Sequence, residues 1–316
     1  MTDPRIGVMF DRSWDPAGLP AFAREVERLG ADDLWVVEDL GWNGGISAAA
    51  VALGATERLR VGLGIAPAPL RSPALLAMEV ATLARVFPGR FVAGIGHGVR
   101  EWMRQLGVAP RSPLALLEET LTAVRALLRG EEVRLDGREL RLDGVRLVHP
   151  PAPEAVPPVL AGVIRPKSLE LAGRAAQGTL VDEGNGPDDL HRVRAAAERG
   201  GAGPDHQLTV YAFFGLGEAA APALRKAVGE HAEWLGRSPE QIFSVSGSPA
   251  EAAAALTALG AAGAGTVVLR PCGPDPLVQL AELLASRSSR AIASRASSAA
   301  PSASTESSKN ASGEWL

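Results

Sequence analysis

The stretch from Asp33 to Gly98 constrains the fold more than any other part of the chain. It contains three short apolar strand patterns, each ending in glycines or charged residues and each followed by a helical pattern. In a closed parallel β/α barrel all strands point the same way, so their carboxyl ends gather at one mouth, where active sites lie. Open backbone and a few polar groups there would suit a flat ligand with polar edges. The three strand ends are Glu38-Asp39, Gly64-Ile65-Ala66 and Gly96-His97-Gly98.

The alternation of strand and helix continues along most of the chain. Strands are predicted at Arg5–Phe10, Asp33–Val37, Leu59–Ile65, Arg90–Ile95, Pro158–Ala161, Gly178–Val181, Thr209–Phe214 and Thr266–Leu269. Helices are predicted at Leu19–Leu29, Ile46–Ala55, Pro73–Phe87, Pro113–Leu128, Pro166–Ala176, Pro187–Arg199, Ala219–Leu235, Pro249–Ala262 and Leu277–Ala285. Eight strands with interleaved helices predict the α/β class and a (β/α)8 TIM barrel. A doubly wound parallel sheet is the alternative, because sequence pattern separates the two poorly.

Two segments depart from this alternation. Residues 131–157 contain the tight-turn dipeptides Asp136-Gly137 and Asp143-Gly144 between short alternating runs, which predicts a β-hairpin insertion at the rim of the barrel. Residues 286–316 are rich in serine and alanine and have few large apolar side chains, so we expect a disordered tail. The expected organisation is one barrel domain over residues 1–285 followed by this tail.

Composition and charge exclude several classes of function. A chain of 316 residues that is 46% hydrophobic can bury the core of one barrel domain. The net charge of −4 gives no overall positive field, so neither nucleic acid nor a membrane surface is an expected partner. No apolar stretch approaches about 18 residues and no signal-peptide pattern is visible, so a cytoplasmic protein is expected.

The sequence gives no indication of a metal site or a disulfide. Its five histidines are scattered, and neither a CxxC nor an HExxH spacing occurs. The single cysteine, Cys272, cannot form an intrachain disulfide and fits a reducing compartment. No adjacent base is evident beside it, so we expect Cys272 to be an inert packing residue.

Several motifs in this order resemble the bacterial luciferase-like superfamily of flavin-dependent oxidoreductases, whose barrel binds FMN or the deazaflavin F420. The motifs are WVVED, RVGLGIAPAPLRSP, ATLARVFPGRFVAGIGHG, PPVLAGVIRPKSLELAGRAAQGTLVDEG and SGSPAEAAAALTALGAAGAGTVVL. Strands three to six are most similar to the F420-linked, methylenetetrahydromethanopterin reductase-like branch. The resemblance implies hydride transfer through F420 or monooxygenation through FMN, acting on a small organic substrate. It also implies a homodimer and, with FMN, a separate reductase that supplies reduced cofactor.

The resemblance implies a site for the cofactor ring at the ends of the third and fourth strands. In F420-binding relatives the third strand ends in a bulge with a non-prolyl cis peptide, which corresponds here to the bond between Gly64 and Ile65, with Ala66 following. Gly96 and Gly98 match the loop after strand four, where backbone lies along the cofactor. The alternative for Gly64 is that it only allows tight strand packing.

The anionic end of the cofactor has a physical argument of its own. Gly162 and Arg165 lead into a predicted helix whose first turn carries Lys167 and Ser168. Free backbone N–H groups, the positive helix end and two cations together form an anion site. The resemblance places the phosphate here and near the Gly178-Thr179 turn, with Arg71 as a secondary candidate. The alternative is that Arg165 and Lys167 are ordinary solvated charges.

Candidate catalytic residues are Glu38, Asp39 and His97. The first two match an acidic-then-histidine pair in relatives, and aspartate replaces the usual histidine at position 39. Either carboxylate could accept hydrogen bonds from ring N–H groups or, if desolvation raises its pKa, act as an acid. The alternative is a solvated charge at the rim or a pair with an arginine of the barrel. Some relatives carry a glutamate acid where this chain has Val99, and His97 could replace it or merely fill the loop. Trp42 resembles aromatic residues that line the substrate side.

Two other classes of function stay open at this stage. One is a non-catalytic protein of the same fold that only binds a flavin or F420, since the histidine and glutamate of relatives are absent at positions 39 and 99. The other is a phosphate-binding barrel aldolase or isomerase, which would need a lysine or paired carboxylates at strand ends. The lysines of the chain are Lys167, Lys226 and Lys309, and none lies late on a predicted strand.

Overall fold

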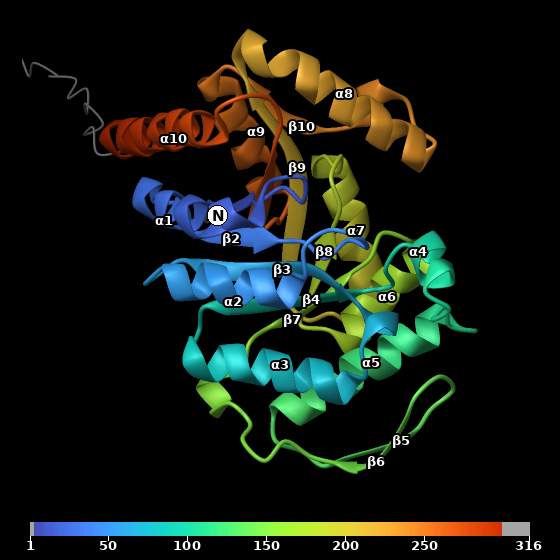
Figure 1. Ribbon diagram of the computed structural model, residues 1–316. Coiled ribbons are helices and arrows are strands. Elements are labelled where there is room, and N and C mark those ends of the chain that lie inside the picture. Colours follow the sequence, from blue (N-terminus) through green and yellow to red (C-terminus); the bar gives the residue numbers. More distant parts are fainter. Residues whose placement is uncertain (1–2, 299–316) are drawn as a thin grey trace, which may run out of the picture.

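The computed structural model describes residues 3–298, which form a closed parallel barrel surrounded by helices (Figure 1). The ring consists of β1 (Arg5–Met9), β2 (Asp33–Val36), β3 (Arg60–Pro67), β4 (Phe91–Gly96), β7 (Val159–Gly162), β8 (Gly178–Val181), β9 (Gln207–Leu216) and β11 (Thr266–Pro271). Because β8 pairs with β9 and β11 pairs with β1, the ring has no open edge. This closure confirms the predicted TIM barrel, since a doubly wound sheet would leave two edges unpaired.

Helices follow the strands and cover the outside of the ring. They are α1 (Leu19–Leu29), α2 (Gly45–Ala55), α3 (Pro73–Val86), α4 (Arg100–Gln105), α5 (Pro113–Leu128), α6 (Pro166–Ala175), α7 (Pro187–Arg199), α8 (Gly217–Leu235), α9 (Pro249–Ala261) and α10 (Pro276–Ser298). Many begin with a proline, whose missing N–H costs nothing in the first turn. The short α4 and the strand β10 (Ser244–Gly247), which pairs with the carboxyl half of β9, are not among the predicted elements.

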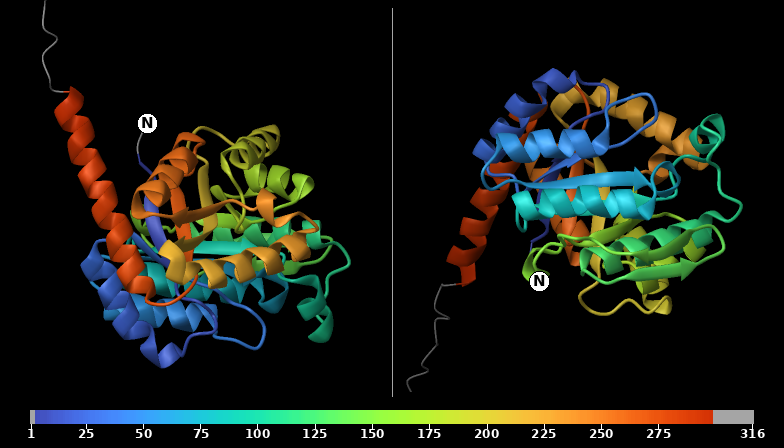
Figure 2. Two further views of the ribbon diagram at one scale, coloured as in Figure 1. Left: turned by 90° about the horizontal axis from the view of Figure 1, so that it is seen from above. Right: turned by 60° about the horizontal axis from the view of Figure 1, so that its bottom comes forward.

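The last helix is longer than the sequence predicts. It continues past Ala285, where the prediction ended it and placed a disordered tail. An anchor explains part of the extension, because the guanidinium of Arg287 donates a hydrogen bond to the carbonyl of Pro4. The helix packs beside α1 and α9 and projects beyond the barrel (Figure 2). The prediction of disorder is therefore wrong for residues 286–298, whereas residues 299–316 lie outside the described part.

Two aromatic rings fill the centre of the barrel. Trp35 on β2 and Tyr211 on β9 are both buried and meet edge to face, with ring centroids 5.9 Å apart. Glycines on the neighbouring strands make room, because a Cβ on Gly7 or Gly62 would lie 2.8 or 2.3 Å from the tryptophan ring. Apolar side chains pack around the pair, namely Met9, Val92, Leu160, Leu180 and Val268. The interior is therefore solid below the mouth, as in other barrels of this kind.

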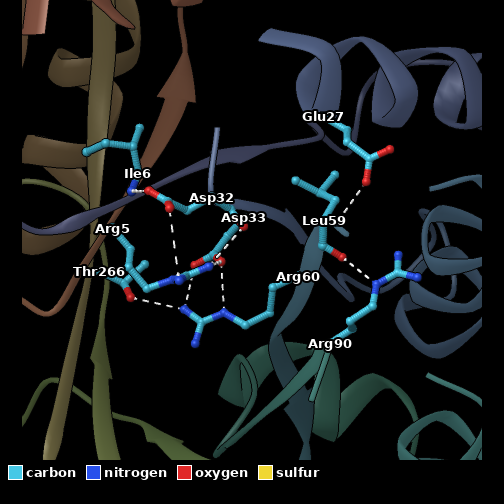
Figure 3. Close-up of polar contacts among 9 residues, drawn as sticks. All are labelled: Arg5, Ile6, Glu27, Asp32, Asp33, Leu59, Arg60, Arg90 and Thr266. Carbon is cyan, nitrogen blue, oxygen red and sulfur yellow. Dashed lines mark hydrogen bonds and ion pairs between the residues drawn. The ribbon is translucent and has the colours of Figure 1, made fainter. Parts of the chain in front are cut away.

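An ion-pair network around Asp33 closes the amino end of the barrel (Figure 3). The Asp33 side chain is fully buried, and its oxygens accept hydrogen bonds from Arg5 at 2.7 Å and Arg60 at 2.6 Å. Arg60 also donates to the hydroxyl of Thr266 at 3.3 Å. Because these four residues begin four strands, the network ties β1, β2, β3 and β11 together. This end of a barrel serves stability rather than chemistry.

The predicted hairpin insertion is present, as β5 (Val133–Asp136) and β6 (Arg141–Val145) form an antiparallel pair. It lies outside the barrel along α5 (Figure 1). The Glu119 carboxylate on α5 accepts hydrogen bonds from the backbone N–H groups of the hairpin turn, at residues 138–140. In return, Glu139 of the turn accepts a hydrogen bond from the backbone N–H of Ser112, just before α5. The hairpin turn is thus fixed to the first turns of α5, at the carboxyl end of the barrel.

Candidate active site

A cavity of about 1410 Å³ opens at the carboxyl ends of the barrel strands. Its walls come from the carboxyl ends of β3 and β11, from the loops after β1, β2, β4, β7 and β8, and from α4, α5, α6 and α8. Met9, Leu180 and Tyr211 belong both to its lining and to the packed centre of the barrel, so they form the floor. The mouth is therefore an open concave site with an apolar base and polar walls, the usual form of a small-molecule site.

Most of the predicted site residues line this cavity. They are Glu38, Asp39, Gly64, Ile65, His97, Gly98, Gly162, Arg165, Lys167 and Ser168. Two others lie directly behind the wall. Ala66 is buried in β3 and pairs with Ile95. A Cβ on Gly96 would lie 2.7 Å from the carbonyl oxygen of Gly162, so this glycine permits close packing of β4 and β7.

The bulge at the end of β3 has the predicted backbone form. The peptide bond between Gly64 and Ile65 is cis, and the pairing of β3 with β4 shifts register between Leu63 and Ala66. A Cβ on Gly64 would lie 2.3 Å from the Tyr211 hydroxyl, so only glycine fits above that ring. The Ile65 side chain lies against a second glycine, since a Cβ on Gly162 would be 2.3 Å from its Cγ2. Gly64 and Gly162 thus leave the space that the bulge needs at the mouth of the barrel.

The residues of the predicted anion site lie together at the start of α6. Arg165 and Lys167 are exposed at the cavity wall and form no ion pair with any residue in 3–298. Buried Ser168 lies in the same turn, with its Oγ 3.0 Å from His97 Nε2. Two further arginines that the sequence reasoning missed, Arg100 and Arg111, also line the cavity without an ion-pair partner in the described chain. Together these residues give one corner of the cavity an excess of positive charge.

Three predicted residues lie outside the cavity, and the structure corrects their assignment. Gly178 and Thr179 are at the amino end of β8, far from the mouth, because they begin the strand rather than end it. Gly178 packs closely against the backbone of Gln207, and Thr179 Oγ1 lies 2.8 Å from His206 Nε2. Trp42 is 51% exposed on the loop after β2, outside the cavity lining.

Glu38 and Asp39 both have arginine partners, which is the alternative that the sequence left open. The buried Glu38 carboxylate accepts two hydrogen bonds from Arg71, at 2.5 and 2.8 Å, and one from the backbone N–H of Gly45. Asp39 pairs with Arg12 at 2.5 Å. A bidentate arginine favours the ionised carboxylate, so Glu38 holds the loop after β3 and the start of α2 in place. Both carboxylates are therefore held in ion pairs.

His97 is held in a fixed position on the cavity wall. Burial lowers the pKa of its imidazole, so the ring is neutral at neutral pH. Its Nε2 contacts Ser168, whereas its Nδ1 is buried without a hydrogen-bond partner in the described chain. A buried polar atom of this kind normally has a partner. The structure therefore makes His97 a candidate ligand contact beside the positively charged corner.

A second polar group of residues lies across the cavity. Asp182 and Glu183 follow β8, Arg270 ends β11 and His231 lies on α8. Arg270 donates to Glu183 at 3.1 Å, and His231 Nε2 lies 2.9 Å from the Glu183 carbonyl and 3.6 Å from Asp182. The sequence contains a signal for the first two, because they directly follow a predicted strand, as Glu38 and Asp39 do. No comparable signal marks His231, which comes from the middle of a helix.

Among residues 3–298 there is no group of three or more histidine, cysteine, aspartate or glutamate side chains that could hold a metal ion. None of the helices in that range is long and apolar enough to cross a membrane. Cys272 is buried, and desolvation raises the pKa of its thiol to about 11, so it remains protonated and unreactive at neutral pH.

The fold and the position of the cavity agree with the family to which this chain is related by sequence. The sequence model of the luciferase-like monooxygenase family matches residues 2–270. The chain therefore belongs to the luciferase-like monooxygenase family, which confirms the resemblance inferred from the strand-end motifs.

The chain is similar in sequence to reductases, and in fold to both reductases and monooxygenases. The chain is 25% identical over 241 residues to a 5,10-methylenetetrahydromethanopterin reductase from Methanolobus tindarius, covering 75% of this chain and 73% of that protein. The coenzyme F420-dependent tetrahydromethanopterin reductase from Methanopyrus kandleri has the same fold, with a TM-score of 0.80, 18% identity and coverage of 92% and 99%. So does the oxygenating constituent of 3,6-diketocamphane monooxygenase from Pseudomonas putida, in complex with FMN, with a TM-score of 0.69, 18% identity and coverage of 90% and 97%.

Proposed function

We propose that this protein is an oxidoreductase that binds coenzyme F420 in the cavity and transfers a hydride between it and a small organic molecule. The observation that carries the proposal is the pairing of two features in one cavity. Glycines leave room for a backbone bulge at Gly64 and Ile65, and cations without an ion-pair partner in residues 3–298 line the same cavity. A planar redox ring joined to an anionic tail matches this arrangement. Membership of a family with F420-dependent and FMN-binding members supports the same conclusion.

The described residues fit such a cofactor. Tyr211 Oη and His97 Nδ1 are buried polar atoms without a partner in residues 3–298, and both belong to residues that line the cavity. Polar edges of a bound ring would supply those partners. The bound cofactor would supply the hydride chemistry, which no side chain of the protein can carry out. The protein would orient the ring, exclude water and hold the second substrate.

The positive corner favours F420 over FMN. Arg100, Arg111, Arg165 and Lys167 contribute four positive charges without an ion-pair partner in the described chain. FMN ends in a single phosphate, whereas the tail of F420 carries a phosphate and several carboxylates. Four cations balance the longer anionic tail better. The start of α6 adds the positive end of a ten-residue helix.

Other residues of the site would act through position. The Glu38–Arg71 pair fixes the loop after β3, directly after the bulge. The hydrogen bond between Ser168 and His97 links α6 to the loop after β4, so the two walls of the positive corner keep a constant spacing. Trp102, Leu114 and Trp234 add apolar surface to the cavity lining and would shield the second substrate from water.

The test is a binding titration of the purified full chain with three ligands, followed by fluorescence quenching. The ligands are F420, FMN and the deazaflavin core of F420 without its phosphate and tail. We expect micromolar affinity for F420 and at least about 10-fold weaker binding of the tail-free core, because phosphate contacts contribute roughly 1.5–3 kcal/mol each. Tighter binding of FMN than of F420 would replace the proposal with an FMN-dependent monooxygenase. Absence of binding by all three ligands would contradict the proposed function.

A second measurement separates the enzyme from a protein that only binds the cofactor. The F420-loaded chain is offered reduced and oxidised small molecules, and the absorbance change of the cofactor is followed. Turnover with any of them supports the oxidoreductase. Tight binding without turnover across alcohols, ketones and imines would favour the non-catalytic alternative. The homodimer expected from the resemblance stays a prediction that light scattering can test.

A further inference from the structure

Asp182 differs from every other carboxylate that lines the cavity. These carboxylates are Asp11, Glu38, Asp39, Glu101, Asp182, Glu183 and Glu230. Six of them form an ion pair with an arginine or a lysine, whereas Asp182 forms none within the described residues. Its ionisable partner at short range is His231, whose Nε2 lies 3.6 Å from Asp182 Oδ2. The charge of Asp182 is therefore not fixed by a permanent cation.

The carboxyl group of Asp182 is held in place and largely withdrawn from solvent. Its side chain is 23% exposed, and Oδ2 is buried without a hydrogen-bond partner in residues 3–298. The other oxygen, Oδ1, accepts a hydrogen bond from the side-chain amide of Asn185 at 3.1 Å. One oxygen is thus oriented by the loop and the other is enclosed beside His231, so a molecule in the cavity would reach the carboxyl group at the exposed part of the side chain.

The position of Asp182 follows from the geometry of β8. Leu180 lies against the bulge, since a Cβ on Gly64 would be 3.2 Å from its Cδ1. Side chains two residues apart along an extended strand point to the same face. The Asp182 side chain therefore lies on the same face as Leu180 but two residues nearer the mouth, and both residues line the cavity. This places the carboxyl group beside the space above Gly64 and Ile65.

We propose that Asp182 is the residue that exchanges a proton with the substrate, with His231 as its positioning partner. The inference rests on the function proposed above. Reduction of a carbonyl group to an alcohol adds a hydride to carbon and a proton to oxygen. The hydride comes from the reduced cofactor, and the proton comes from the Asp182 carboxyl group, which becomes a carboxylate. In the reverse direction the Asp182 carboxylate accepts the hydroxyl proton while the hydride returns to the oxidised cofactor.

The charges around Asp182 fit this role. Desolvation, with a smaller contribution from the adjacent Glu183, raises the pKa of Asp182 to about 7. The Asn185 hydrogen bond and the charge of Arg237 act in the opposite direction. A group with a pKa near 7 is present in both forms at neutral pH, so it can donate and accept a proton. In the same polar group, Arg270 is already paired with Glu183 and Asp11.

His231 supports Asp182 without competing for its proton. Burial lowers the pKa of His231 below its usual value, which favours the neutral imidazole at neutral pH. Its Nε2 lies 2.9 Å from the carbonyl oxygen of Glu183, which makes Nε2 the protonated nitrogen and directs that N–H past Asp182. The residues assigned by resemblance are less suited to proton exchange, because Asp39 is ion-paired and position 99 is valine.

The first experiment is an infrared titration of the full chain between about pH 5 and about pH 9, following the C=O stretch of a protonated carboxyl group. The wild-type protein is expected to lose such a band with a midpoint near pH 7. The band should be absent from Asp182→Asn and retained in Asp39→Asn, the matched control. A wild-type protein with no titrating band in this range, or the same band in Asp182→Asn, overturns the proposal. This readout needs no cofactor.

The second experiment uses the F420-loaded chain with cyclohexanone as the probe ketone. Asp182→Asn should lower kcat by about 10²-fold or more and remove the pH dependence near neutrality, with F420 affinity and KM within a few-fold of wild type. Equal kcat in the variant overturns the proposal. If the wild-type chain does not bind F420, the proposed function fails, whereas the infrared band still decides the protonation of Asp182.

Discussion

The two ends of the barrel use buried charge in opposite ways. At the amino end, Asp33 is fully buried, and both of its oxygens accept hydrogen bonds from Arg5 or Arg60. At the carboxyl end, Asp182 Oδ2, Tyr211 Oη and His97 Nδ1 are buried without partners in the described chain. Since buried polar groups are normally hydrogen-bonded, the first end is complete in itself and the second is arranged for a ligand. Stability and binding are therefore separated along the barrel axis.

The largest expected effect is on the pH dependence of stability. The pKa of Asp182 is raised from 3.8 to about 7 in the folded protein. Between these pH values the Asp182 carboxyl group binds more protons in the folded state than in the unfolded state. The free energy of unfolding is therefore highest below about pH 4, and this contribution of Asp182 is lost as the pH rises through 7. Asp182→Asn should remove this loss, which amounts to about 4 kcal/mol. Urea denaturation at a series of pH values measures it.

Asp182→Asn also tests whether the amino and carboxyl ends of the barrel have different roles. Above about pH 8, Asp182→Asn should be more stable than the wild-type protein, because it removes an ionised carboxylate from a poorly solvated position. A variant that is less stable at every pH would mean that Asp182 is part of the structural framework, and the separation of roles between the two ends would then fail.

The next effect concerns the amino end. Asp33→Asn leaves two arginines without a carboxylate in a largely buried network, which should destabilise the fold by roughly 3 kcal/mol. F420 affinity of the folded variant should stay within about twofold of wild type, because the network is at the end remote from the cavity. Denaturation measures the free energy of unfolding, and fluorescence titration of the same preparation measures F420 affinity. A large loss of affinity in a stable variant would contradict the comparison.

A complementary change at the carboxyl end should affect binding without affecting stability. The double substitution Arg165→Ala and Lys167→Ala removes two exposed cations that have no ion-pair partner in residues 3–298, so F420 affinity should fall by about 100-fold. The urea midpoint should not change. Arg134→Ala with Arg141→Ala is the matched control, because both arginines are exposed on the hairpin. Equal losses of affinity in the two double variants would indicate a general effect of net charge.

The smallest expected effect is that of a substitution at Gly162, the glycine that contacts the bulge at the end of β3. Gly162→Ala adds a Cβ that would lie 2.3 Å from Ile65 Cγ2, so Ile65 and the bulge must shift. A shift of this kind should weaken F420 binding by about 10-fold and cost about 1 kcal/mol or more of stability. Glycine to alanine at Gly54 is the control, because a Cβ there meets nothing within 4 Å. Unchanged affinity in Gly162→Ala would remove the bulge from the proposed site.

Much of the fold could be predicted from the sequence, because hydrophobic periodicity reports strands and helices directly. The predicted bounds of α1, α5, α7 and β8 agree with the structure residue for residue. Local signals were weaker where tertiary contacts decide the structure. The composition around residue 286 favours disorder, yet a contact between Arg287 and the distant Pro4 anchors the helix. Such a contact leaves no trace in local composition.

The candidate site was predicted in part, and the errors have clear physical causes. Residues named from strand ends, such as Gly64 and His97, line the cavity. Gly178 and Thr179 were misplaced because a glycine at the start of a strand resembles a glycine in a loop at its end. His231 was missed because it approaches Asp182 from a helix 49 residues further along the chain. The partners of Glu38 were likewise invisible until Arg71 was placed beside it.

The hairpin insertion has a consequence for how this protein could be altered. Its turn is bound to the start of α5 by Glu119 and Glu139, and the residues just before that helix, Arg111 and Ser112, belong to the cavity wall. The hairpin insertion therefore holds part of the cavity wall in position. Exchanging or shortening it in an engineered chimera would change the tail-binding corner as well, so the insertion and the pocket must be transplanted together.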